Sequence, residues 1–194
     1  MKKWLPTAVS IAMVAAAWAQ EPKPAIDNEH VTVWDETSPK GLNNAAHDTV
    51  ILWIAGPKAR TAEFIAKGSS GGKGTKDDRA VVIELKDAPP AHYENTTGYP
   101  AAFPRPHVKK LLENKRVVIW SYRWTPGEPT PMHFHDKDVV VVYLEPTALT
   151  STTPDGAKKL NEYKAFDIRF NLGNRSHTEG LAHGDGSAMM MELK

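Results

Sequence analysis

The chain has 194 residues, with 24 lysines and arginines against 23 aspartates and glutamates, and it contains no cysteine. A balanced charge argues against binding to nucleic acid, because phosphate-driven affinity needs an excess of Lys and Arg on one surface. The lack of cysteine excludes disulfides and lipid attachment through an N-terminal cysteine, so a buried core has to provide the stability.

The N-terminus has the pattern of a secretory signal peptide. Two lysines precede an apolar stretch over residues 5–17, and the sequence Ala-Trp-Ala before Gln20 offers a small-x-small cleavage site. The apolar stretch is shorter than the about 18 residues that a membrane span needs, and no later stretch approaches that length. We therefore expect a signal peptide over residues 1–19, a flexible lead-in over residues 20–27, and a periplasmic or secreted protein without a membrane span.

Short runs rich in Val, Ile and aromatic residues, broken by Pro, Gly, Asn and Asp, dominate the rest of the chain and are typical of strands. Residues 60–67 and 106–114 instead fit short helices, and a Pro-rich stretch over residues 87–106 fits a connector between two halves. Because no long helix separates the strands, the pattern predicts an all-β sandwich or barrel. The predicted strands cover residues 31–34, 49–55, 80–85, 116–124, 139–144, 166–172 and 188–193.

Two parts of the chain share one order of motifs, which indicates an internal repeat. Residues 28–34, Asn-Glu-His-Val-Thr-Val-Trp, correspond to residues 114–120, Asn-Lys-Arg-Val-Val-Ile-Trp, and each part closes on Glu-Leu-Lys. The alternative is an accidental match between segments that share the residue pattern typical of strands. We expect an N-terminal half over residues 28–105 and a C-terminal domain over residues 106–194.

A His-x-His sequence is the strongest local signal for chemistry. Side chains alternate between the two faces of a strand, so His133 and His135 point the same way while Phe134 packs on the other side. A pair of imidazoles suits Zn, Cu, Fe, Ni or Mn. The alternative is two surface histidines in a Pro-rich turn.

The segment from Gly127 to His135 resembles the first motif of the cupin family, in which a glycine and five further residues precede His-x-His. A glutamate follows that motif by three or four residues, but Val139 and Val140 occupy these positions here. Asp138 is the nearest carboxylate, and it is either a substitute ligand or a solvated turn residue.

His177 resembles the histidine of the family's second motif, which places a proline and a glycine shortly before it. Leu172 stands at the proline position and Asn174 at the glycine position. Asn is tolerable there because it enters left-handed backbone conformations more readily than most residues. Glu179 is a second choice for a carboxylate ligand. The resemblance implies a double-stranded β-helix, or jelly-roll, barrel with a divalent transition metal inside. Its expected metal ligands are His133, His135, His177 and Asp138.

The N-terminal half lacks the corresponding site. His47 stands at the position that matches His135, but Ala45 stands where the partner histidine would be. The resemblance therefore implies a two-copy arrangement in which a degenerate N-terminal half accompanies a C-terminal domain that retains the metal site.

Aromatic residues indicate the kind of ligand. Trp120, Tyr122 and Trp124 share one face of the strand before the first motif, and Phe170 lies on the strand before the second. Such stripes are commonly core, but at a barrel mouth they form the apolar wall of a small-molecule pocket. We expect these four residues to line the pocket.

Three functions remain open, since the same barrel hosts many activities. The first is a metal-dependent enzyme of the oxygenase or isomerase type that acts on a small organic molecule. The second is a non-catalytic small-ligand or metal-binding protein of the periplasm. The third is a structural role in which the barrel is an oligomerisation module, for example of a homodimer, and its histidines are incidental.

Overall fold

The computed structural model describes residues 23–194. The predicted signal peptide and most of the predicted lead-in lie outside these residues. Every regular element of the described part is a strand, so the all-β prediction is confirmed. No helix in residues 23–194 is long and apolar enough to cross a membrane. The strands are β1 (Ile26–Asp27), β2 (Val31–Thr37), β3 (Asp48–Ala55), β4 (Thr61–Ile65), β5 (Arg79–Leu85), β6 (Val108–Glu113), β7 (Val117–Arg123), β8 (His133–His135), β9 (Val139–Tyr143), β10 (Thr147–Thr152), β11 (Lys158–Tyr163), β12 (Ile168–Asn171), β13 (Arg175–Gly184) and β14 (Ser187–Leu193).

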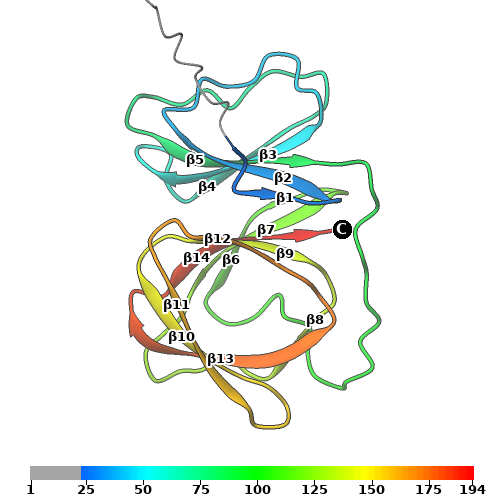
Figure 1. Cartoon of the computed structure of the whole chain (residues 1–194), viewed down its shortest axis with the longest axis vertical. Coiled ribbons are helices and arrows are strands. Elements are labelled where there is room, and N and C mark those ends of the chain that lie inside the picture. Colours follow the sequence, from blue (N-terminus) through cyan, green and yellow to red (C-terminus); the bar gives the residue numbers. More distant parts are fainter. Residues whose placement is uncertain (1–22) are drawn as a thin grey trace, which may run out of the picture.

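The strands form three antiparallel sheets that are stacked as layers (Figure 1). The N-terminal sheet has the order β1-β2-β5-β3-β4, and the middle sheet has the order β12-β9-β14-β7-β6. The outer sheet has the order β11-β10-β13-β8. The middle and outer sheets enclose a barrel, and the N-terminal sheet covers the outside of the middle sheet.

The middle sheet is buried on both faces, which explains why its strands read as continuous apolar runs. In β9, Val140 and Val142 pack against the N-terminal sheet, whereas Val139 and Val141 point into the barrel. In β14, Met189 continues the first of these layers. Two separate apolar cores therefore hold the three layers together.

The N-terminal and middle sheets share their strand order, since β2-β5-β3-β4 matches β7-β14-β9-β12. The strands β2 and β7, which correspond in this order, also have the same hydrogen bond at their start. The Asn28 side chain accepts a hydrogen bond from the backbone N of Val31 (2.9 Å), and the Asn114 side chain accepts one from Val117 (3.0 Å). The boundary between residues 105 and 106 stays a prediction.

Both predicted helices are wrong. Residues 61–65 form β4 and residues 108–113 form β6, and each strand pairs with a single neighbour at a sheet edge. An edge strand is half exposed, so its apolar residues are sparse. In β6 the register shifts between Lys110 and Leu112, which breaks the alternation of a strand and produces a spacing that mimics a helix.

The Pro-rich connector runs along the edge of the outer sheet. The backbone N of Ala102 donates to the carbonyl of Phe134, and the backbone N of Phe134 donates to the carbonyl of Pro100, each at 2.8 Å. Ala102 and Phe103 are buried in the barrel core. The connector therefore acts as a further edge of the barrel beside β8.

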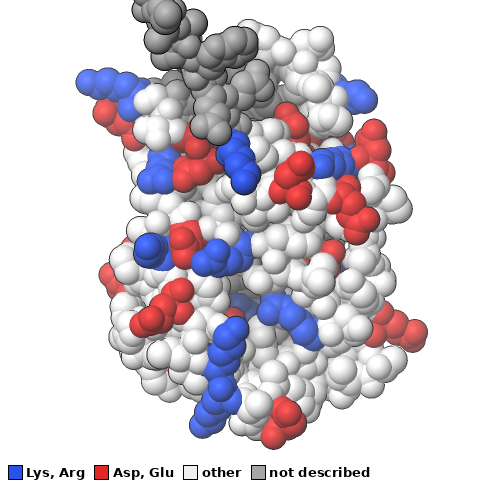
Figure 2. Space-filling model, viewed as in Figure 1, with Lys and Arg blue, Asp and Glu red and all other residues white. Residues whose placement is uncertain are grey.

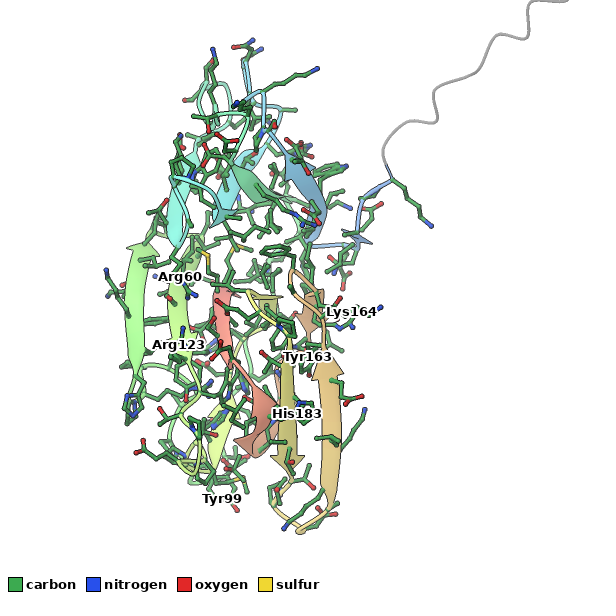
Figure 3. All side chains as sticks on the ribbon, turned by 90° about the vertical axis from the view of Figure 1, so that its left-hand side faces the viewer. Arg60, Tyr99, Arg123, Tyr163, Lys164 and His183 are labelled. Carbon is green, nitrogen blue, oxygen red and sulfur yellow. The ribbon has the colours of Figure 1, made fainter. Side chains whose placement is uncertain are left out.

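A polar contact also joins the N-terminal part to the barrel. The Arg60 side chain, labelled in Figure 3, donates from Nη2 to Glu145 Oε1 at 2.6 Å. Exposed ion pairs contribute little stability, so the apolar core between the sheets provides most of the cohesion.

Candidate metal centre

Three histidines meet inside the barrel on the outer sheet. His177 of β13 pairs directly with His133 of β8, and His135 lies two residues further along the same face. All three side chains are buried, and their ligand atoms lie within 4.8 Å of one another. The Nε2 atom of His135 is 3.2 Å from Nε2 of His133 and 3.2 Å from Nε2 of His177. The structure thus brings together the three histidines that the motifs indicate.

These histidines are in the form that binds a metal. Burial, followed by the charge of Arg105, lowers the pKa of His133 to about 4. Burial, followed by the charge of Arg175, lowers the pKa of His177 to about 3 and that of His135 well below its usual value. All three imidazoles are therefore neutral at pH 7, as metal ligands must be.

The orientation of His133 is set by a backbone group. Its Nδ1 lies 2.8 Å from the carbonyl oxygen of Pro131, to which it donates. The proton on Nδ1 leaves Nε2 with a lone pair that points toward the other two histidines.

The spacing of the three nitrogens fits one transition-metal ion. Two nitrogens at about 2.1 Å from one ion lie about 3.0 to 3.4 Å apart at octahedral or tetrahedral angles. The observed separations of 3.2 Å fall in this range. Imidazole donors suit Fe, Mn, Ni, Cu and Zn, and the residues do not discriminate among them.

Asp138 has a different environment from the one expected. It is 1 % exposed, so it is not a solvated turn residue. Its Oδ1 accepts a hydrogen bond of 2.7 Å from the backbone N of Gly173, which ties the start of β9 to the turn before β13. The group of ligand atoms within 4.8 Å of one another does not include Asp138, so the structure does not support it as a metal ligand.

The second motif has the backbone that the sequence suggests. Asn174 has φ 54°, which is the left-handed conformation expected at the glycine position of the motif. Its backbone N donates to the carbonyl of His135 at 2.8 Å. Asn174 therefore turns the chain into β13 and toward His177.

Glu179 lies beside the three histidines. Its Oε1 is 3.9 Å from His177 Nε2, and its Oε2 accepts a hydrogen bond of 3.3 Å from Trp124 Nε1. Of the two carboxylates weighed as ligands, Glu179 is the one that faces the histidines.

Arg105 is a site residue that the sequence did not reveal. It comes from the connector, and its Nη1 is 3.0 Å from His133 Nε2. Its guanidinium packs against the rings of Phe103 and Tyr122, at 4.7 and 4.2 Å from their centroids. Burial lowers the pKa of Arg105, with Glu179 opposing this effect, but a guanidinium remains charged in proteins. No motif or periodicity marks this arginine, since it lies between two prolines in an irregular segment.

The predicted aromatic residues separate into two groups. Trp120, Tyr122 and Trp124 point into the barrel, and Trp124 lines the cavity at the histidines. Phe170 packs on the other face of the middle sheet, in the core against the N-terminal sheet. The prediction of Phe170 as a pocket residue is therefore wrong, and its neighbour Asn171 lines the cavity instead.

The histidines lie at the inner end of a polar cavity. The outer part has a volume of about 350 Å³. Tyr143, Asn171, Arg175, His177 and Glu179 line both the inner and the outer parts. The outer part is further lined by Ser151, Thr153, Ala157, Lys158, Lys159, Asn161 and Tyr163. The inner part holds only about 20 Å³, so a small molecule in the outer part, which is rich in hydrogen-bonding groups, approaches the site at His177 and Glu179.

Figure 2 shows basic and acidic side chains interspersed over the visible face. Arg123 and His183, labelled in Figure 3, have side chains that are 56 % and 67 % exposed, and neither belongs to the histidine cluster.

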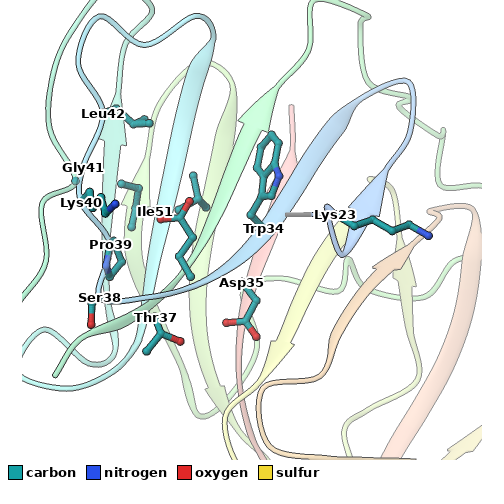
Figure 4. A pocket seen from close by; sticks show the side chains of 13 residues that line it. Lys23, Trp34, Asp35, Thr37, Ser38, Pro39, Lys40, Gly41, Leu42 and Ile51 are labelled. Atoms are coloured by element: carbon teal, nitrogen blue, oxygen red, sulfur yellow. The ribbon is translucent and has the colours of Figure 1, made fainter. Parts of the chain in front are cut away.

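A second cavity, of about 450 Å³, lies on the N-terminal sheet (Figure 4). Trp34 and Ile51 of the sheet and residues 38–42 of a loop line it. Within residues 23–194, the only cluster of metal-ligating side chains is the one in the barrel.

Comparison with known proteins supports the fold. No family model and no curated protein matches the chain by sequence. Among solved structures, a cupin 2 conserved barrel domain protein from Leptotrichia buccalis matches with a TM-score of 0.54 and 11 % identity, over 87 % of this chain and 86 % of that one. AerE from Microcystis aeruginosa matches with a TM-score of 0.52 and 10 % identity, over 89 % of this chain and 97 % of that one. The prediction of a cupin-type barrel is confirmed, and the chain has the double-stranded β-helix fold of the cupin superfamily.

Proposed function

We propose that the protein is a metal-dependent enzyme that acts on a small organic molecule. His133, His135 and His177 would hold a divalent transition metal, which is Fe, Mn, Ni, Cu or Zn. The observation that carries this proposal is the convergence of three buried imidazoles beside a passage from the surface, with Nε2 of His135 3.2 Å from Nε2 of each of the other two.

A metal held by three imidazoles keeps positions open for substrate or water, and it supplies Lewis-acid, water-activating or oxygen chemistry when bound. Glu179 lies next to these positions and can accept or return a proton at Oε1, which faces His177. The carbonyl of Pro131 holds His133 in place. This arrangement supports an oxygenase or isomerase type of reaction.

A non-catalytic binding protein is the second candidate function. It is favoured by the lack of a carboxylate in the ligand cluster, because Val139 and Val140 stand where the motif has its glutamate. A three-histidine site without that glutamate can capture a metal or a small ligand without turning it over.

Export to the periplasm or the exterior is part of the proposal, and it rests on the sequence of residues 1–19. Fractionation of the native host, with mass spectrometry of the N-terminus, tests it. A mature chain that begins near Gln20 in the exported fraction is the expected result, and an uncleaved cytoplasmic chain would contradict it.

Metal analysis of natively purified protein tests the function. We expect about one transition-metal ion per chain, lost in His133→Ala, His135→Ala and His177→Ala and kept in the exposed control His183→Ala. A protein that binds no metal after loading with any of the five metals would overturn the proposal. Oxygen uptake and product formation with candidate substrates then separate the enzyme from the binding protein.

A further inference from the structure

Arg105 is a buried cation with too few acceptors. Its side chain is 6 % exposed, and its Nε has no hydrogen-bond partner among the described residues. The nearest carboxylate oxygen, Glu179 Oε2, lies 4.0 Å from Nη2, which is beyond hydrogen-bond distance. Buried charges are normally paired and hydrogen-bonded, so the guanidinium has unused capacity.

A metal in the site would remove another acceptor from this arginine. Nη1 of Arg105 lies 3.0 Å from Nε2 of His133, whose Nδ1 already donates to Pro131. A neutral imidazole has one lone pair, which can accept from Arg105 or bind a metal but cannot do both. If the proposed function is correct, Nη1 must therefore find a new acceptor next to the metal.

The charges that line the passage also lack a counterpart. Arg105 and Arg175 line the inner cavity, and Lys158 and Lys159 line its outer part. Glu179 is the only carboxylate among the residues that line these two parts. Glu192, which is buried behind the lining and bonded to Trp120, adds a more distant carboxyl group near Arg105. Even two carboxylates do not balance two guanidinium groups and a divalent metal, so the loaded site favours an anionic ligand.

The geometry of Arg105 favours an anion with two oxygens that can accept at once. Its guanidinium is fixed between the rings of Phe103 and Tyr122, which leaves its planar fork of donors in a set orientation. Such a fork matches the paired oxygens of a carboxylate or a phosphate, which is why the test below includes both. The passage of about 350 Å³ is at the small end of ligand pockets, and the hydroxyl and amide groups of Tyr143, Asn161 and Asn171 line it.

We propose that the ligand of this site is a small organic carboxylate. Its carboxylate accepts hydrogen bonds from Arg105 beside the metal, and its polar remainder lies toward Arg175 and the outer passage. This inference rests on the proposed function and specifies the substrate class of the same site. Arg105 is then a binding residue that the connector supplies to the barrel.

Calorimetric titration of the zinc-loaded protein tests the inference. The probes are acetate, glycolate and malonate, each matched with its neutral amide, together with inorganic phosphate. We expect at least one carboxylate to bind and its amide to bind much more weakly, because the amide removes the charge and keeps the shape. Equal binding of acid and amide, binding of phosphate alone, or no binding of any carboxylate would overturn the inference. This comparison uses the unmodified protein, so it does not depend on the folding of a variant.

Arg105→Met then assigns the binding to this residue. Removing one partner of a buried charge pair should weaken the binding of the carboxylate by about 30-fold or more. The zinc content should remain at the level of the unmodified protein. Arg123→Met, on an exposed arginine, is the matched control and should change neither quantity. Unchanged carboxylate affinity in Arg105→Met overturns the inference alone, whereas a protein that takes up no metal overturns the proposed function first.

Discussion

Asp138 offers the sharpest test of the metal site, because two roles for it predict different results. Its Oδ1 accepts the buried N–H of Gly173 at 2.7 Å, and its Oδ2 is buried without a partner. Asp138→Ala leaves the Gly173 N–H unsatisfied, which should lower the free energy of unfolding by about 1–3 kcal/mol. For a domain of this size, each kcal/mol lowers the unfolding temperature by roughly 2–4 °C. Asp138→Asn keeps the accepting oxygen and should unfold close to the unmodified protein.

Thermal unfolding and metal analysis of the same samples distinguish the two roles. If Asp138 acts only on the backbone, both variants keep the metal content and affinity of the unmodified protein. The exposed Asp185→Ala is a control that should change neither stability nor metal. Loss of metal in Asp138→Asn, with its folding intact, would make Asp138 a ligand and would refute the three-histidine interpretation.

Three further predictions concern the layers around the site. Leu52→Ala, in the fully buried core between the sheets, should cost about 2–5 kcal/mol in denaturant unfolding, and a loss below 1 kcal/mol would contradict the packing. Phe170→Leu should lower stability but leave carboxylate affinity unchanged, which calorimetry can check, because Phe170 faces away from the barrel. Burial raises the pKa of the Glu192 carboxyl, so the folded state binds this proton more tightly than the unfolded state does. The free energy of unfolding therefore falls as the pH rises through the pKa of the folded state. Glu192→Gln keeps an acceptor for Trp120 and should raise the unfolding temperature at pH 8 but not at pH 4; an equal effect at both would contradict the sign.

The histidine pair could be predicted because its geometry is local. Two residues that are two apart on a strand share a face whatever the rest of the fold does, and His133 and His135 do so here. His177 required a family motif, because a pairing between strands 42 residues apart leaves no local signal. Neither the alternation of side chains along a strand nor a family motif could predict Arg105. Its position depends on backbone contacts between an irregular connector and β8, and such contacts have no period in the sequence.

The alternation of side chains along a strand also explains why Phe170 was wrongly predicted to line the pocket. Alternation predicts that Phe170 and Asn171 point to opposite faces, but it does not say which face looks into the barrel. In most antiparallel sheets the polar face is the solvent face. Here the middle sheet is covered on both sides, so the apolar Phe170 faces the N-terminal sheet and the polar Asn171 faces the cavity. In a barrel whose cavity has a polar lining, the polar face of a strand can therefore be the one that points inward.

The same layering accounts for the difference between the two related sheets. A metal site of this kind needs a second sheet opposite the first, because β8 and β13 of the outer sheet supply all three histidines. Among residues 23–194, the N-terminal sheet has loops rather than paired strands on its outer face, and Ala45 is buried there in a small apolar cluster with Trp53. A histidine at position 45 would therefore have no paired strand beside it to bring a third ligand, as β13 does for β8. What the N-terminal sheet provides instead is cover for the back of the middle sheet, which leaves the other face of that sheet free to enclose the site.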